Sequence, residues 1–199
     1  MVFSAHLFLF YFLPLALGLY YLSPPRARHL LLTLLSYGFY GWANPLFCVL
    51  LLTSTLIDYA CGRVLVGWRA DPVTRELPRL QPGTPRSRMQ RGAVLVSIVS
   101  NLALLGFFKY FNLGVDTLNA LAAAFGSDAS LDVAFRVVLP LGISFYTFQS
   151  MSYSIDVYRG HAAPLRSFVD FACYVSLFPQ LVAGPIIRYQ ELADQMRSR

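Results

Sequence analysis

The stretch LPLGISFYTFQSMSYSIDVYRG, residues 139–160, decides how the rest of the chain must be arranged. Residues 141–158 are enough to cross a bilayer as a helix, yet they include hydroxyls, an amide and a carboxylate. Because lipid cannot satisfy these groups, the segment belongs inside a helix bundle or beside a water-filled cavity. The pattern alone leaves both arrangements open.

The polar side chains of this segment fall on two faces of the predicted helix. At 100° per residue, Gln149, Ser152 and Asp156 share one face. The nearly opposite face carries four further polar side chains, which are Ser144, Thr147, Ser154 and Tyr158. Such side chains either hydrogen-bond neighbouring helices or line a channel for substrate.

A second apolar segment, residues 171–187, ends in the motif LFPQLVAGPIIR at residues 177–188. Pro179 lies in its middle and Gly184-Pro185 near its end, and each proline removes a backbone donor from a helix. Freed carbonyls at membrane depth need partners in protein or water. We therefore predict a broken helix, which either spans the membrane or re-enters it.

Composition places the whole chain in a membrane. Of its 199 residues 56% are hydrophobic and only 13% are charged. The predicted fold is all-α, a single polytopic membrane domain over residues 1–199, with the lipid bilayer as its surroundings and at least one broken or re-entrant helix. About six apolar segments are expected, at residues 3–22, 30–43, 46–68, 92–111, 141–158 and 171–187.

Positive charge gives the expected orientation. The net charge of +6 does not indicate nucleic-acid binding, because the arginines lie between apolar segments rather than on one surface. Residues 69–91 hold six arginines and form the predicted cytoplasmic loop, on the same side as Arg26 and Arg28. The N-terminus is then outside. Residues 112–132 should form an outer connection, with a separate short helix at 115–125 on the outer surface.

Two carboxylates fall within the predicted spans. Asp58 is expected to make structural polar contacts, with Tyr59 and Arg63 close by in sequence, rather than to relay protons. Asp156 and Arg159 are three residues apart and able to pair. The three cysteines have neither the spacing of a disulfide framework nor that of a metal site, and no metal is expected.

Several stretches of the chain resemble one protein family in their order of occurrence. Residues 1–22, 30–45 and 104–119, together with the two motifs quoted above, are similar to the N-terminal half of the membrane-bound O-acyltransferase (MBOAT) family. The resemblance is to the branch that acts in bacterial alginate O-acetylation, in the bacterial inner membrane. It implies an acyl donor such as acyl-CoA, a polysaccharide acceptor and periplasmic acetylation proteins as partners.

The resemblance also bears on catalysis. Ester formation needs a base, usually histidine, but none of His6, His29 and His161 lies within an apolar span next to an Asn, Asp or Ser partner, and His6 is at the outer end of the first segment. In the family the catalytic histidine follows a Gly-Leu-Trp context in the C-terminal half, and that motif does not occur here. We therefore assign no catalytic residue and expect the chain to be inactive without a C-terminal half or partner subunit, so whether it is itself an enzyme stays open.

Motif positions are the remaining site candidates. The resemblance assigns to the scaffold or substrate channel Gln149, Asp156, Arg159, Gln180, Gly184, Pro185 and Arg188. Polar spans and broken helices also suit a transporter or channel subunit, or a noncatalytic scaffold for an acyl-transfer partner. These functions remain alternatives.

Overall fold

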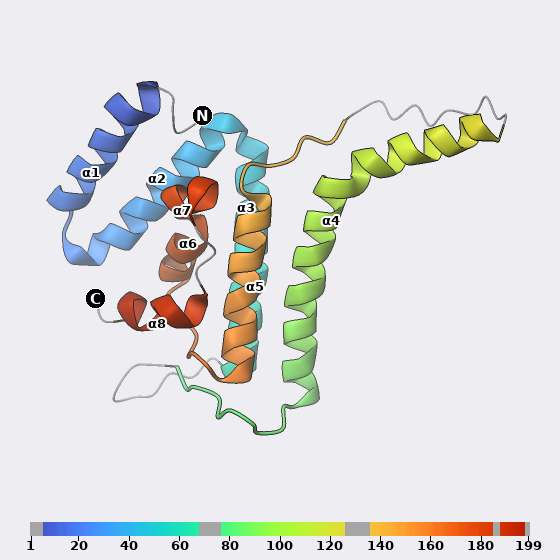
Figure 1. Ribbon diagram of the computed structural model, residues 1–199. Helices are drawn as coiled ribbons and strands as arrows, with labels where there is room; N and C mark the ends of the chain where they lie inside the picture. Colours follow the sequence, from blue (N-terminus) through green and yellow to red (C-terminus); the bar gives the residue numbers. More distant parts are fainter. Residues whose placement is uncertain (1–5, 68–76, 126–135, 185–187, 198–199) are drawn as a thin grey trace.

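The computed structural model describes residues 6–67, 77–125, 136–184 and 188–197, and in these ranges every regular element is helical (Figure 1). Eight are α-helices: α1 (Leu13–Leu22), α2 (Arg28–Ala43), α3 (Pro45–Val66), α4 (Arg88–Ala124), α5 (Ile143–Arg159), α6 (Phe168–Ser176), α7 (Phe178–Ala183) and α8 (Tyr189–Arg197). A π-helix, Phe8–Phe12, precedes α1, and a 3-10 turn, Pro25–Ala27, precedes α2. The all-α class is confirmed.

The π-helix accommodates Pro14 in the first apolar segment. Pro14 has no N–H to donate, and it lies in the first turn of α1. Immediately before it, the Leu13 N–H reaches back to the Phe8 carbonyl oxygen, a wider turn than an α-helix makes. The chain therefore stays helical up to Leu22.

Helix α5 lies in the interior of the bundle. It packs against α3 and α4 on one side and against α6, α7 and α8 on the other, and α2 covers α6 (Figure 1). Tyr146 and Tyr153 on α5 are fully buried, and the ring centroids of Tyr153 and Phe171 on α6 are 4.3 Å apart. A separate aromatic cluster, formed by Phe8, Phe12, Phe39 and Phe178, joins the N-terminal segment to α2 and α7.

The outer surface is apolar. Along α4 the exposed side chains include Leu95, Val99, Leu102 and Phe107, which water would not favour over so large an area. Helices α3 and α4 are long and apolar enough to cross a membrane, whereas Phe8–Leu22 and Phe168–Leu181 are apolar but shorter. The surface therefore suits lipid, although the structure does not establish six separate spans.

The predicted outer connection is wrong in one respect. Residues 115–125 are helical as expected up to Ala124, but they continue α4 without a break, and Figure 1 shows the helix bending in its middle instead. Asn112 does not cap a new helix, because its side chain is used by the chain returning to α5. Its Nδ2 donates to the Val137 carbonyl oxygen at 2.7 Å, and its Oδ1 accepts from the Val137 N–H at 3.0 Å. Residues 126–132 lie outside the described ranges.

The predicted break in the last apolar segment is confirmed. Helix α6 ends at Ser176, Leu177 leaves the helical conformation, and α7 starts at Phe178 with Pro179 in its first turn. The break precedes the proline because the N–H groups of the first turn of a helix have no acceptor within the helix, so proline costs no hydrogen bond there. The Phe178 N–H donates instead to Ser36 Oγ on α2 at 3.2 Å.

Candidate functional site

A loop holds the C-terminal end of α5. The described part of the predicted basic loop, residues 77–87, runs beneath this end in Figure 1. Arg79 Nε donates to the Gly160 carbonyl oxygen at 2.7 Å, and Arg86 Nε donates to that of Tyr158 at 2.8 Å. These are carbonyls that a helix leaves without partners at its C-terminus, where cations are also favoured by the helix dipole. The end of α5 is thereby fixed in place.

An open pocket of about 270 Å³ lies beside this end of α5. Its walls come from α5, from the turn after it and from the start of α8, and the lining residues are Ser152, Ile155, Asp156, Arg159, His161, Arg188 and Gln190. Two members of the first predicted face of α5, Ser152 and Asp156, thus line a polar cavity. The opposite face is packed inside the bundle, where Thr147 and Ser154 are fully buried.

Asp156 is the most buried charged group of the pocket, with 6% of its surface exposed. Its Oδ2 accepts from the Gln190 N–H at 3.2 Å, so it caps the start of α8. Its Oδ1 is 3.9 Å from His161 Nδ1, close enough for attraction but too far for a hydrogen bond. The predicted pairing with Arg159 is wrong, because the carboxylate faces α8 while Arg159 is exposed at the mouth of the pocket.

Two guanidinium groups of the pocket are unengaged. Among the described residues, the side chains of Arg159 and Arg188 make neither a hydrogen bond nor an ion pair. Arg188 directly precedes α8 and Arg159 ends α5, so the two charges enter the pocket from different elements. An arrangement of this kind can bind an anion.

The other motif residues meet at the break between α6 and α7. Gln149 Nε2 donates to the Tyr174 carbonyl oxygen at 2.6 Å and to Gln180 Oε1 at 3.2 Å. Gly184 packs so closely that an added Cβ would lie 2.7 Å from Gln180 Cα. The motif therefore divides into this amide cluster and the pocket of Asp156, and Pro185 lies outside the described residues.

The sequence patterns did not identify Gln190 as a pocket residue, and they treated His161 only as a possible base. His161 reaches the pocket through the turn that follows α5, whereas Gln190 reaches it because α8 returns against α5, and the patterns considered above do not predict α8. Its signal is present: Tyr189, Leu192 and Ala193 are spaced three and four apart, and Tyr189 and Ala193 are buried. Recognising that face would have placed Gln190 near Asp156.

Asp58 belongs to a second buried polar cluster, between α3 and α4. Ser97 Oγ donates to its Oδ1 at 2.5 Å, and Asn101 Nδ2 donates to its Oδ2 at 2.8 Å. Asn101 Oδ1 in turn accepts from Ser54 Oγ and Ser150 Oγ, so the cluster also reaches α5. The prediction of structural contacts is confirmed, but the partners come from α4, and the Tyr59 hydroxyl donates to the Arg166 carbonyl oxygen instead.

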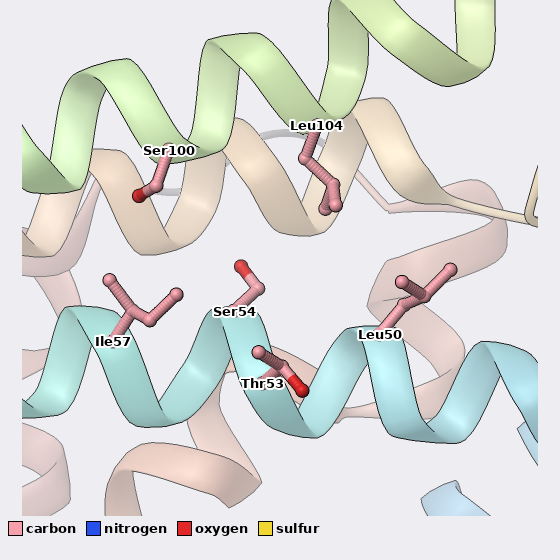
Figure 2. A pocket seen from close by; sticks show the side chains of 6 residues that line it. All are labelled: Leu50, Thr53, Ser54, Ile57, Ser100 and Leu104. Atoms are coloured by element: carbon pink, nitrogen blue, oxygen red, sulfur yellow. The ribbon is translucent and has the colours of Figure 1, made fainter.

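A small pocket of about 50 Å³ lies next to this cluster. Figure 2 shows its lining, with side chains of α3 and α4 facing each other across the gap: Leu50, Thr53, Ser54, Ile57, Ser100 and Leu104. The Thr53 hydroxyl donates to the Val49 carbonyl oxygen within α3. The Ser100 hydroxyl donates to the Ser97 carbonyl oxygen within α4. The pocket thus presents an apolar surface and offers little chemistry.

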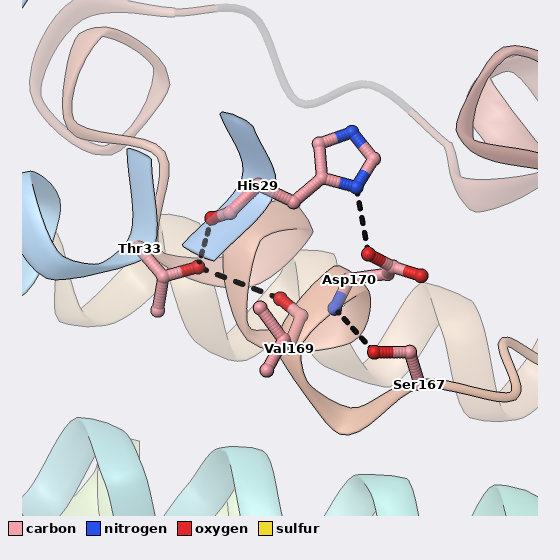
Figure 3. Close-up of polar contacts among 5 residues, drawn as sticks. All are labelled: His29, Thr33, Ser167, Val169 and Asp170. Atoms are coloured by element: carbon pink, nitrogen blue, oxygen red, sulfur yellow. Dashed lines mark hydrogen bonds and ion pairs between the residues drawn. The ribbon is translucent and has the colours of Figure 1, made fainter. Parts of the chain in front are cut away.

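His29 and Asp170 connect α2 to α6. Figure 3 shows His29 Nδ1 at 2.7 Å from Asp170 Oδ1, beside the Ser167 hydroxyl that accepts from the Asp170 N–H. Thr33 Oγ1 donates to the His29 carbonyl oxygen at 2.7 Å. The contact therefore fixes His29 between two helices. Among the residues that the structure describes, no group of three or more His, Cys, Asp or Glu side chains could hold a metal ion.

Comparison with known proteins gives the chain its relatives. It is 44% identical over all 199 residues to a protein of Azotobacter vinelandii named probable alginate O-acetylase AlgI. The chain is thus similar over its whole length to proteins named as alginate O-acetylases. It is 42% identical to the protein of that name from Pseudomonas aeruginosa, and 28% identical to a peptidoglycan O-acetyltransferase of Helicobacter pylori.

These alginate O-acetylases are longer than the chain. The 199 residues span 36% of the Azotobacter vinelandii protein and 35% of the Pseudomonas aeruginosa protein, about a third of each. No family model and no solved structure matches the chain. The similarity to alginate O-acetylases confirms the resemblance to that branch drawn from the motifs, and the apolar exterior and the two long apolar helices suit a membrane protein.

Proposed function

We propose that this chain forms part of an O-acetyltransferase that transfers acetyl groups to hydroxyls of an exopolysaccharide of the alginate type. The observation that carries the proposal is the 44% identity, over every residue of the chain, to an alginate O-acetylase. The more distant relative is named for peptidoglycan, another sugar polymer. Polysaccharide hydroxyls are therefore the proposed class of acceptor.

The polar groups around α5 would form the wall of the substrate path. In this role Asp156, Arg159 and Arg188 line the open pocket at the end of the helix. Gln149 and Gln180 bridge α5 to the broken helix, with Gly184 and Pro185 following in the same motif. The polar path would cross the bundle beside α5, because the break between α6 and α7 interrupts the apolar packing there.

The proposed setting is the bacterial inner membrane, with the N-terminus outside and the loop at residues 69–91 in the cytoplasm. The arginine-rich composition of that loop supports this orientation. Since residues 77–87 contact the end of α5 through Arg79 and Arg86, the pocket would open to the cytoplasm. It would then face the acyl donor, for which acyl-CoA is the candidate.

The reaction requires a base that accepts the proton of the acceptor hydroxyl. His29 is held by Asp170, and His161 lines the pocket without donating a hydrogen bond to Asp156. We assign neither the catalytic role. We propose instead that the base comes from a further part of the enzyme or a partner subunit, that this chain alone is inactive, and that periplasmic acetylation proteins complete the system.

A chimeric protein tests the proposal. This chain would replace the matching third of the Pseudomonas aeruginosa alginate O-acetylase, to which it is 42% identical, in a strain lacking its own copy. We expect the chimera to restore acetyl esters on the secreted alginate, measured by NMR of the polymer. The chain expressed alone should restore none.

Three results would count against the proposal. If the chimera accumulates in the membrane to the same level as the native protein but the alginate carries no acetyl groups, the proposed acetyltransferase role is wrong. Solute uptake by vesicles containing only this chain would favour the transporter instead. A chimera that binds its partner proteins but needs none of the pocket residues for acetylation would favour a scaffold.

A further inference from the structure

We propose that the pocket at the C-terminal end of α5 binds a phosphate group, with Arg159 and Arg188 as its principal ligands. This inference deepens the proposed function, since it gives the chemical class of the ligand that enters the same pocket. It depends on the geometry of the pocket and is tested by binding, without any acetyl transfer.

Two guanidinium groups converge on the pocket. Arg159 comes from the end of α5 and Arg188 from the residue before α8, and both line one pocket of about 270 Å³. Neither side chain has a partner among the described residues. Other arginines nearby are engaged, because Arg79 and Arg86 donate to backbone carbonyls. The two at the pocket are therefore available to a ligand.

Positive charge predominates at the end of α5. Among the described residues, the acidic side chains here are Asp156, which lines the pocket, and Glu191, which follows the lining residue Gln190, and the Asp156 carboxylate accepts from the Gln190 N–H. Four guanidinium groups belong to the same region, those of Arg79, Arg86, Arg159 and Arg188. Four positive charges against two negative ones give an excess of two. An anion is therefore the expected ligand.

The number of donors favours a phosphate. A carboxylate has two oxygens, which a single guanidinium fork can satisfy. Two forks on different elements suit an anion with three terminal oxygens and a charge near −2, which a phosphate monoester has. The Gln190 side chain and the His161 ring also line the pocket and can donate to the remaining lone pairs, whereas the Ser152 hydroxyl already donates to the Gln149 carbonyl oxygen. We infer a phosphate rather than a carboxylate.

Phosphate can arrive from two sources, a soluble phosphorylated molecule or a phospholipid headgroup, and two binding measurements distinguish them. The full chain is purified in detergent. Calorimetry with inorganic pyrophosphate reports the soluble source. Native mass spectrometry with phosphatidic acid, compared with diacylglycerol of the same acyl chains, reports the lipid source.

Arginine variants then locate the site. We expect Arg159→Gln and Arg188→Gln each to weaken binding about tenfold, since each removes a charge-assisted pair of hydrogen bonds. Arg159→Lys should fall between the wild type and Arg159→Gln, because lysine keeps the charge and loses the fork. The matched control is Arg136→Gln, an arginine 73% exposed and paired with Asp116, which should not change binding. Equal thermal unfolding midpoints show that the variants are folded.

Losses confined to the pyrophosphate titration would identify a soluble ligand, and losses confined to phosphatidic acid would identify a lipid. The proposal is overturned if the wild-type chain binds neither probe, or if the variant lacking both arginines binds as the wild type does. It is also overturned if an oligouronate, which carries only carboxylates, binds as tightly as pyrophosphate. None of these outcomes bears on acetylation by the chimera, so the two proposals fail separately.

Discussion

Gly160 and Leu80 lie so close together that a Cβ atom added at Gly160 would overlap the Leu80 carbonyl oxygen. Gly160 also has a φ of +78°, which other residues rarely adopt. The close contact seats residues 77–87 under α5, together with the bonds from Arg79 and Arg86. A glycine thus permits the basic loop to pack against the end of α5, the helix whose last turns line the candidate pocket.

We predict that Gly160→Ala strongly lowers the thermal unfolding midpoint of the chain in detergent, because the loop backbone cannot shift as cheaply as a side chain. Gly106→Ala is the matched control. Gly106 is helical with no atom within 4 Å of an added Cβ, and alanine there should stabilise by about 0.5–1 kcal/mol. Equal midpoints for the two variants would contradict the packing of the loop on α5.

We predict that Asn101→Leu destabilises the contact of α3, α4 and α5. The change leaves the Asp58 carboxylate with Ser97 as its donor and removes the acceptor of the Ser54 and Ser150 hydroxyls. Buried groups left without partners should cost about 2–3 kcal/mol in the free energy of unfolding. Chemical denaturation in mixed micelles measures the change.

Ser100→Ala is the control for that variant, one residue away on the same helix. Its hydroxyl donates to the Ser97 carbonyl oxygen within α4, so its loss should change stability by less than about 0.5 kcal/mol. If both variants behave alike, the Asp58 cluster does not join the helices.

We predict that Gln149→Leu loosens the broken helix. The Tyr174 carbonyl oxygen near the end of α6 would lose its 2.6 Å hydrogen bond, and Gln180 would lose its neighbour. The expected loss is about 1–3 kcal/mol. Cys173 on α6 is 4% exposed, so its reaction with a maleimide, followed by peptide mass mapping, should become faster. Phe148→Leu, at an exposed position beside it, should leave the rate unchanged.

We predict measurable coupling between His29 and Asp170. A double-mutant cycle with alanine at each position should give about 1–2 kcal/mol, since the pair is at 2.7 Å and its side chains are only 14% and 30% exposed. The Arg136 and Asp116 pair serves as comparison, because it is 73% and 52% exposed and should give at most about 1 kcal/mol. Similar coupling in both pairs would show that burial between α2 and α6 adds nothing.

Local signals in the sequence were enough to predict several helices. Asn44 and Pro45 end one apolar segment and start the next, and the structure shows Asn44 accepting the Leu46 N–H at the start of α3. Pro179 predicted the broken helix, although the break falls at Leu177. These features depend on the backbone chemistry of neighbouring residues, which a sequence displays directly.

Other features depend on contacts between distant residues. The apolar segment was predicted to end at residue 111, but the Asn112 amide binds Val137 and α4 continues. Asp156 and Arg159 have the spacing of an ion pair, but Gln190 takes the carboxylate. The sequence identified the polar face of α5, while the partners that complete the pocket come from α8.

The length of α4 has a consequence for the membrane. At 1.5 Å per residue, its 37 residues extend about 55 Å, nearly twice the roughly 30 Å of a hydrocarbon core. One upright crossing cannot contain such a helix, and the bend in Figure 1 turns its distal half aside. Exposed Leu118, Leu121 and Phe125 on that half would then rest among lipid headgroups and set the depth of immersion of the whole bundle.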